Sequence, residues 1–152
     1  MNAKIRQSIL IGCATLITGF VIWSAQAQAP VPPDLLVQGE QQWAAGELDQ
    51  AQKSFEQALR AQPRSVSAHM KLAGLQLSRQ QFTACIDTYQ GAIGLDANNA
   101  RAWLGLGFAY LHTGQDALAM AAFNQAVRAD PSTQEKLAPL MDKLMARAPS
   151  AD

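Results

Sequence analysis

The sequence predicts an all-α protein built from helical hairpins that repeat along the chain. Of its 152 residues, 28 are Ala and 17 are Gln, whereas Val, Ile and Thr together number only ten after residue 27. This balance favours helices over sheets. Similar residues also recur every 34 positions, which is typical of a stack of repeated helix pairs. A chain of this length is expected to form one domain.

The period of 34 appears in four columns that each take one residue from every unit. Two columns hold small residues, one holds aromatic residues and one holds only alanine. The columns are Gly39, Ala73 and Gly107; Ala51, Cys85 and Ala119; Phe55, Tyr89 and Phe123; and Ala58, Ala92 and Ala126. Turn residues keep the same register at Gly46, Gln80 and Gly114. The repeats are assigned to residues 32–65, 66–99 and 100–133.

The third repeat resembles the tetratricopeptide repeat family. The residues that carry the resemblance are Trp103, Leu106, Gly107, Tyr110, Ala119, Phe123, Ala126 and Pro131. The resemblance extends over about 100 residues, and the first two repeats depart from the pattern at Leu35, Gln38, Gln42, His69, Ala73, Gln76 and Ala97. It implies a right-handed superhelix of antiparallel helix pairs, an α-solenoid with about three repeats. In such a stack the small residues let neighbouring helices approach, and the aromatic column fills the space between units.

Residues 1–27 are predicted to be a secretory signal peptide or a signal anchor. Lys4 and Arg6 precede an apolar run over residues 8–23, and small residues follow over residues 24–29, in the order typical of a secretory signal. The run is shorter than the roughly 20 residues that a membrane-spanning helix needs, which favours cleavage over retention as an anchor. Both alternatives place the rest of the chain outside the cytoplasm, because the basic residues Lys4 and Arg6 keep the N-terminus on the cytoplasmic side of the membrane.

We therefore expect a periplasmic or otherwise extracytoplasmic protein, anchored to the inner membrane only if residues 1–27 are retained. Leu10–Cys13 resembles a bacterial lipobox, but the apolar run continues well past Cys13, which favours an ordinary signal. Without residues 1–27 the chain has 10 basic and 12 acidic residues, and Cys85 is its one cysteine. A disulfide within the chain is then excluded, and the slightly negative charge argues against a nucleic acid partner.

Residues 28–33 are predicted to form a stiff Pro-rich spacer, because each proline fixes its own backbone and restrains the residue before it. The tetratricopeptide domain is expected to follow over residues 34–147. Asp34 is predicted to be the N-cap of its first helix, since a short acidic side chain can accept hydrogen bonds from free backbone N–H groups.

A further helix is predicted to close the stack after the third repeat. Ser132 and Glu135 have the spacing of a capping box, and the capping helix is assigned to residues 133–147. Its apolar stripe consists of Leu137, Leu140, Met141, Leu144 and Met145. This stripe should cover the apolar end of the third repeat, and residues 148–152 are expected to be a tail.

The family resemblance also implies a concave face, lined by residues at fixed positions in each unit. In this chain those positions are mostly apolar, which suits a helical or apolar peptide. The predicted partner-binding groove consists of Leu36, Glu40, Trp43, Met70, Leu77, Arg101, Leu104, Phe108, Leu111 and His112. Family members that clasp acidic C-termini carry Lys, Arg and Asn at several of these positions, where this chain has mainly apolar residues. The same stripe could instead form core, or contact the spacer, the capping helix or a second subunit.

No catalytic residue, metal site or cofactor is expected. His69 and His112 lie in different repeats without Cys or carboxylate partners at metal-ligand spacing, and Cys85 occupies a packed column of small residues, where a thiol is inert. We therefore expect a non-catalytic interaction module for a protein or peptide partner, an adaptor in the assembly or maturation of a cell-envelope complex, by analogy with exported repeat proteins. The alternative is a structural self-association module that forms a homo-oligomer.

Overall fold

The computed structural model describes residues 33–147, and these residues form seven α-helices, one short 3-10 segment and no β-strand. The elements are α2 (Pro33–Ala44), α3 (Leu48–Ala61), α4 (Val66–Ser78), α5 (Phe82–Leu95), α6 (Ala100–His112), α7 (Asp116–Ala129), η2 (Pro131–Thr133) and α8 (Gln134–Arg147). None of these helices is both long and apolar enough to cross a membrane. The predicted signal segment 1–27, the spacer before Pro33 and the tail 148–152 lie outside the described residues.

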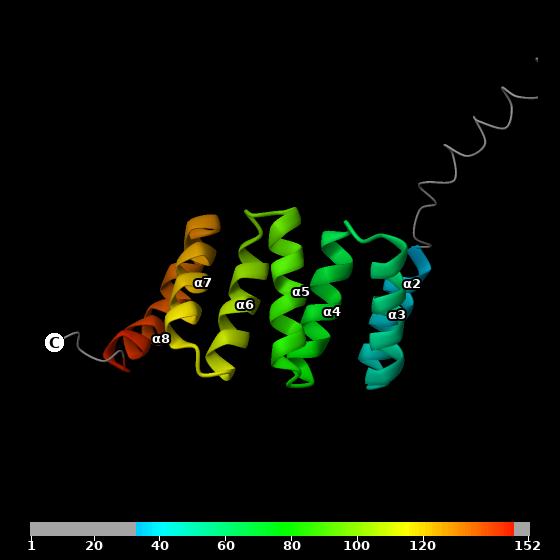
Figure 1. Ribbon diagram of the computed structural model, residues 1–152, viewed down its shortest axis with the longest axis horizontal. Helices are drawn as coiled ribbons and strands as arrows, with labels where there is room; N and C mark the ends of the chain where they lie inside the picture. Colours follow the sequence, from blue (N-terminus) through cyan, green and yellow to red (C-terminus); the bar gives the residue numbers. More distant parts are fainter. Residues whose placement is uncertain (1–32, 148–152) are drawn as a thin grey trace, which may run out of the picture. The chain divides into compact units, whose positions relative to one another are not determined.

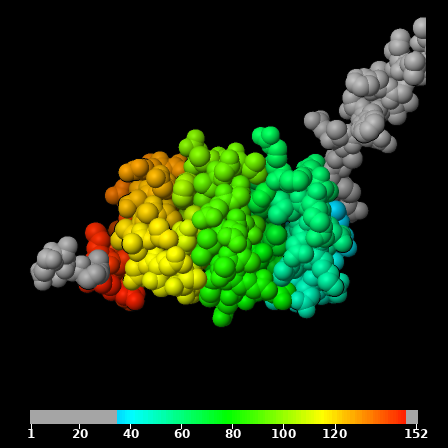
Figure 2. All heavy atoms as spheres, viewed as in Figure 1, coloured from blue at the N-terminus to red at the C-terminus, as the bar shows by residue number. Residues whose placement is uncertain are grey.

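The helices form three antiparallel hairpins, α2 with α3, α4 with α5 and α6 with α7, followed by α8 (Figure 1). Each second helix also contacts the first helix of the next unit, and first helices contact each other from α2 to α4 and from α4 to α6. In the space-filling view of Figure 2 the colours follow one another in chain order, so helices adjacent in sequence are adjacent in space. The predicted all-α stack of antiparallel helix pairs is confirmed.

The turn inside each hairpin depends on one residue with left-handed backbone. Gly46, Gln80 and Gly114 have φ angles of 79°, 60° and 74°, and the three residues are spaced by 34. Glycine adopts this conformation without a steric cost, whereas a residue with a Cβ loses roughly 1–2 kcal/mol. The second repeat keeps the turn in spite of this cost at Gln80, because the helices on both sides of the turn are packed.

Caps at the first helices of the second and third repeats explain where those helices begin. The side chain of Ser65 accepts a hydrogen bond from Ala68 N, and the side chain of Asn99 accepts one from Ala102 N. Both interactions satisfy a backbone donor that has no partner within the helix. These caps therefore fix the first residues of α4 and α6.

Two predicted helix starts are wrong. The first helix begins at Pro33, so Asp34 lies in its first turn instead of capping it, as suits a proline at the first helical position. Ser132 does not form a capping box, because its backbone N–H and its hydroxyl donate to the carboxylate of Asp130 at 3.0 and 2.7 Å. These hydrogen bonds lower the pKa of Asp130. The carboxylate starts the 3-10 turn at Pro131, and α8 follows.

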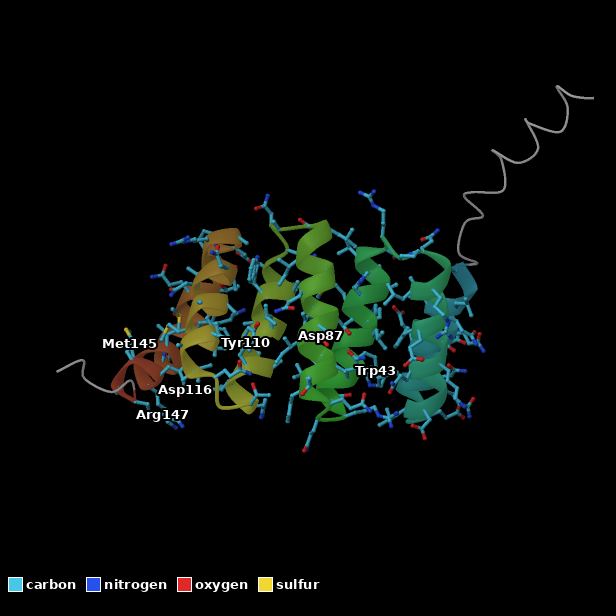
Figure 3. All side chains as sticks on the ribbon, in the orientation of Figure 1. Trp43, Asp87, Tyr110, Asp116, Met145 and Arg147 are labelled. Carbon is cyan, nitrogen blue, oxygen red and sulfur yellow. The ribbon has the colours of Figure 1, made fainter. Side chains whose placement is uncertain are left out.

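The last helix covers the end of the third hairpin. Leu137 and Leu144 are 4% and 3% exposed and pack in one cluster with buried side chains of α7. Leu140 and Met141 are half-buried beside them, whereas Met145 is 58% exposed, so the predicted stripe is wrong at that residue. Arg147 on α8 reaches Asp116 on α7 at 3.7 Å, and Figure 3 shows the two side chains close together.

Removing residues 132–152 should destabilise the domain. Two buried leucines leave the end of the stack, and at about 1.5–3 kcal/mol for each side chain we expect a loss of roughly 3–6 kcal/mol in the free energy of unfolding. Urea denaturation followed by circular dichroism measures this loss. The matched control removes only residues 148–152 and should leave the transition unchanged; equal midpoints for both truncations would show that α8 is not a cap.

Candidate functional site

A hollow of 400 Å³ lies between α4 and α6, near the turn that joins α4 to α5. We call it the α4–α6 hollow, and its lining residues are Leu77, Ser78, Gln80, Phe82, Phe108 and His112. Its volume falls within the range of about 300–1,000 Å³ typical of sites that hold small ligands. Because the lining combines apolar walls with a few polar groups, the hollow suits an apolar side chain of a partner.

Aromatic contacts hold the walls of the α4–α6 hollow. The ring of His112 at the end of α6 stacks on Phe82 at the start of α5, with centroids 4.6 Å apart and an angle of 5° between the ring planes. Phe108 meets the buried ring of Phe123 edge to face at 5.3 Å, an arrangement that aromatic pairs favour. The hollow is therefore shaped by rings that are packed against other rings.

A second hollow of 370 Å³ lies between α2 and α4, and we call it the α2–α4 hollow. Its lining residues are Glu40, Trp43, Ala44 and Lys71. Lys71 on α4 forms an ion pair with Glu40 on α2 at 2.6 Å. Trp43 meets Phe55 edge to face at 6.3 Å. The polar partners satisfy each other, so this hollow offers Trp43 as its main apolar contact.

The residues of the predicted groove divide into three groups. Leu77, Phe108 and His112 line the α4–α6 hollow, while Glu40 and Trp43 line the α2–α4 hollow. Four others are half-buried and pack against the buried clusters, namely Leu36, Met70, Leu104 and Leu111. Arg101 is exposed at the start of α6 and lines neither hollow.

Sequence reasoning missed Phe82, Gln80 and Lys71. Gln80 lies in the turn and Phe82 in the second helix of the repeat. A search restricted to first-helix positions therefore passes over both. Lys71 carries the only charge on α4, and its offset of 31 residues from Glu40 is close to one repeat. That offset was the available signal for an ion pair between neighbouring first helices.

The titratable groups near the core serve packing. Burial raises the pKa of the Cys85 thiol to about 11, and Cys85 Sγ donates to the carbonyl of Ala73 at 3.5 Å. Burial, with a smaller effect of Cys85, raises the pKa of Tyr89 to about 12. His69 Nδ1 lies 3.0 Å from the carbonyl of Ser65. Within residues 33–147 no three His, Cys, Asp or Glu side chains gather in a way that could hold a metal ion.

Solved structures share this arrangement of helices. The type III secretion chaperone SycD of Yersinia enterocolitica, in complex with a peptide of the translocator YopD, aligns with a TM-score of 0.73 and 15% identity over 79% of this chain and 96% of that chain. The first TPR domain of Spaghetti (RPAP3), bound to an HSP90 peptide, aligns with a TM-score of 0.69 and 16% identity over 74% of this chain and 88% of that chain. These likenesses concern the fold.

Sequence comparisons agree with the fold. The general transcriptional corepressor ssn6 of Schizosaccharomyces pombe is 33% identical over 79 residues, which are 52% of this chain and 7% of that protein. The chain therefore spans a small part of that relative. Two family models, both described as Tetratricopeptide repeat, match residues 36–100 and 80–147. With the 34-residue period and the stacked hairpins, these matches show that the chain belongs to the tetratricopeptide repeat family.

Proposed function

We propose that this protein is an exported, non-catalytic interaction module that binds a helical or apolar peptide segment of a partner protein. In this proposal it serves as an adaptor in the assembly or maturation of a cell-envelope complex. The observation that carries the binding function is the α4–α6 hollow, where Leu77, Phe108 and Phe82 leave apolar surface open beside the exposed ring of His112. An apolar anchor that fills such a hollow supplies much of the affinity in protein complexes.

The related folds support this choice of ligand. SycD is described in complex with a peptide of YopD, and the Spaghetti domain is described with an HSP90 peptide. The site of this chain differs in chemistry from one that clasps a carboxylate, because the α4–α6 hollow has no Lys or Arg in its lining. We therefore expect the partner segment to present an aromatic or aliphatic side chain and not a terminal carboxylate.

A photo-crosslinking amino acid at position 112 should capture the partner in the native host. His112 stands at the rim of the α4–α6 hollow, so a group placed there lies within reach of a bound segment. Lys53, exposed on α3, is the control position and should yield no adduct. Once mass spectrometry has identified the partner, Phe108→Ala should weaken its binding by roughly 2 kcal/mol or more, measured by calorimetry.

Controls separate a binding role for Phe108 from a structural one. Phe108 also contacts Phe123, so the stability of Phe108→Ala is measured by urea denaturation before any binding experiment. His112→Ala removes the ring that stacks on Phe82, so its stability is measured in the same way. The folded variant should bind the partner several-fold more weakly. Lys53→Ala and Arg60→Ala should do little. The proposed site would be overturned if crosslinked adducts formed from position 53 and not from position 112. It would also be overturned if Phe108→Ala and His112→Ala both bound the partner as tightly as the wild type.

The export part of the proposal rests on residues 1–27 and has its own test. A reporter fused after Asp152 should be active outside the cytoplasm, and N-terminal sequencing of the mature protein should begin near Gln28 or Pro30. A protein that keeps Met1 and fractionates with membranes would instead identify a signal anchor. Reporter activity confined to the cytoplasm would contradict export in both forms.

A further inference from the structure

A third hollow lies between second helices, away from the two hollows described above. It measures 450 Å³ and lies between α5 and α7, with α6 as the third wall. We call it the α5–α7 groove, and its lining residues are Gln90, Ile93, Gly94, Trp103, Leu106, Tyr110, Leu118, Ala121, Ala122 and Gln125. All ten are uncharged, and Leu118 is a large apolar side chain that is 46% exposed.

The preceding repeat shows that this neutral lining is not imposed by the fold. Residues 34 positions earlier occupy the corresponding places between α3 and α5. There Glu56 and Arg60 stand where the groove has Gln90 and Gly94, and these two charges pair at 3.9 Å. Asp87, labelled in Figure 3, corresponds to Ala121. The chain therefore has a charged surface between α3 and α5 and an uncharged one between α5 and α7.

The hydrogen bonds inside the hairpins change at the same point. Ser54 donates to Gln42 at 2.7 Å in the first repeat, and Thr88 donates to Gln76 at 2.8 Å in the second. In the third repeat the corresponding residues are Ala122 and Tyr110. An alanine cannot make this hydrogen bond, so the Tyr110 hydroxyl accepts from Gln90 Nε2 of the neighbouring hairpin at 3.0 Å. The tyrosine ring thereby becomes part of the wall of the groove.

Two aromatic rings stand along the groove at a defined spacing. Trp103 is held by its indole N–H, which donates to the carbonyl of Ala97 at 2.8 Å, and Tyr110 is held by Gln90. Figure 3 shows Tyr110 on α6. The two residues are seven apart on one helix, which places them about 10.5 Å apart along its axis. A polyproline II segment advances about 9.3 Å per three-residue turn, close to this spacing.

We propose that the α5–α7 groove binds the Pro-rich spacer, residues 28–33, of a second copy of this chain. Pro30 and Pro33 are three residues apart, and Pro33 is also the first residue of α2. A spacer that is extended up to the start of this helix places one proline at each ring. Aromatic-lined grooves are the established receptors for Pro-x-x-Pro segments in this conformation. The spacer is uncharged like the groove, and the amides of Gln90 and Gln125 can donate to its backbone carbonyls, which have no partners within a polyproline II helix.

Because the spacer is joined to α2, we expect it to bind the α5–α7 groove of a second copy and not the groove of its own chain. Among the described helices α2 contacts only α3 and α4, and Figure 1 shows α6 and α7 farther along the row. The five residues 28–32 before α2 reach at most about 18 Å, whereas successive helices pack about 8–10 Å apart. Each copy offers one spacer and one groove, so the contact joins copies head to tail unless two copies exchange spacers.

Leu118→Glu tests the groove, with Ala84→Glu as its matched control. Ala84 is exposed and stands 34 residues earlier, so both variants place the same charge at the same position of a second helix. A fluorescent peptide with the sequence of residues 28–34 is titrated against the exported chain. We expect saturable binding that Leu118→Glu weakens at least about tenfold, or 1.4 kcal/mol. Ala84→Glu should bind like the wild type, and circular dichroism verifies that both variants are folded.

The mass of the exported chain gives a second readout. Light scattering should show a mass that rises with concentration, and Leu118→Glu or a double Pro30→Ala, Pro33→Ala variant should remove the increase. A monomer at every concentration would overturn the proposal, as would equal peptide affinity for Leu118→Glu and Ala84→Glu. Crosslinking from position 112 should be unaffected by Leu118→Glu, so failure of the groove is distinguishable from failure of the α4–α6 hollow.

Discussion

Close contact between an aromatic ring and a residue without a side chain is the interaction on which the stack depends. Phe55 and Phe123 are fully buried, and each ring occupies the place where a Cβ on Gly39 or Gly107 would stand. The two helices of a hairpin can therefore approach closely. In the second repeat the small residue is Ala73, which keeps a Cβ, and the ring of Tyr89 lies against Gly105 of the next hairpin. The aromatic column thus joins helices within repeats and between them.

The same contacts shape both candidate interaction surfaces. Phe123, seated on Gly107, supports Phe108 at 5.3 Å, and Phe108 is a wall of the α4–α6 hollow. Tyr89, seated on Gly105, holds α5 against α6, and these two helices form two sides of the α5–α7 groove. The core therefore determines the distance between the helices that line each surface. We infer that substitutions in this core affect binding even where they touch no partner.

The repeat architecture could be predicted from the sequence because its signals are local and periodic. The columns of small and aromatic residues, and the turn at Gln80, follow directly from the 34-residue register. The stack of His112 on Phe82 could not be predicted, since it joins the end of the first helix of the third repeat to the start of the second helix of the second repeat. The helix start at Asp130 was missed because Ser132 and Glu135 matched a capping box, while the better acceptor stood two residues earlier. The α5–α7 groove could be recognised only by comparing the second helices of successive repeats.

Substitution of Gly107 tests the central role of the aromatic contact most directly. Gly107→Ala should lower the free energy of unfolding by about 1–3 kcal/mol, because its Cβ would enter the space of the buried Phe123 ring. Gly94→Ala is the control, since a Cβ there meets nothing within 4 Å and alanine is the better helix former by up to about 1 kcal/mol. Urea denaturation measures both. Equal stability of the two variants would contradict the account.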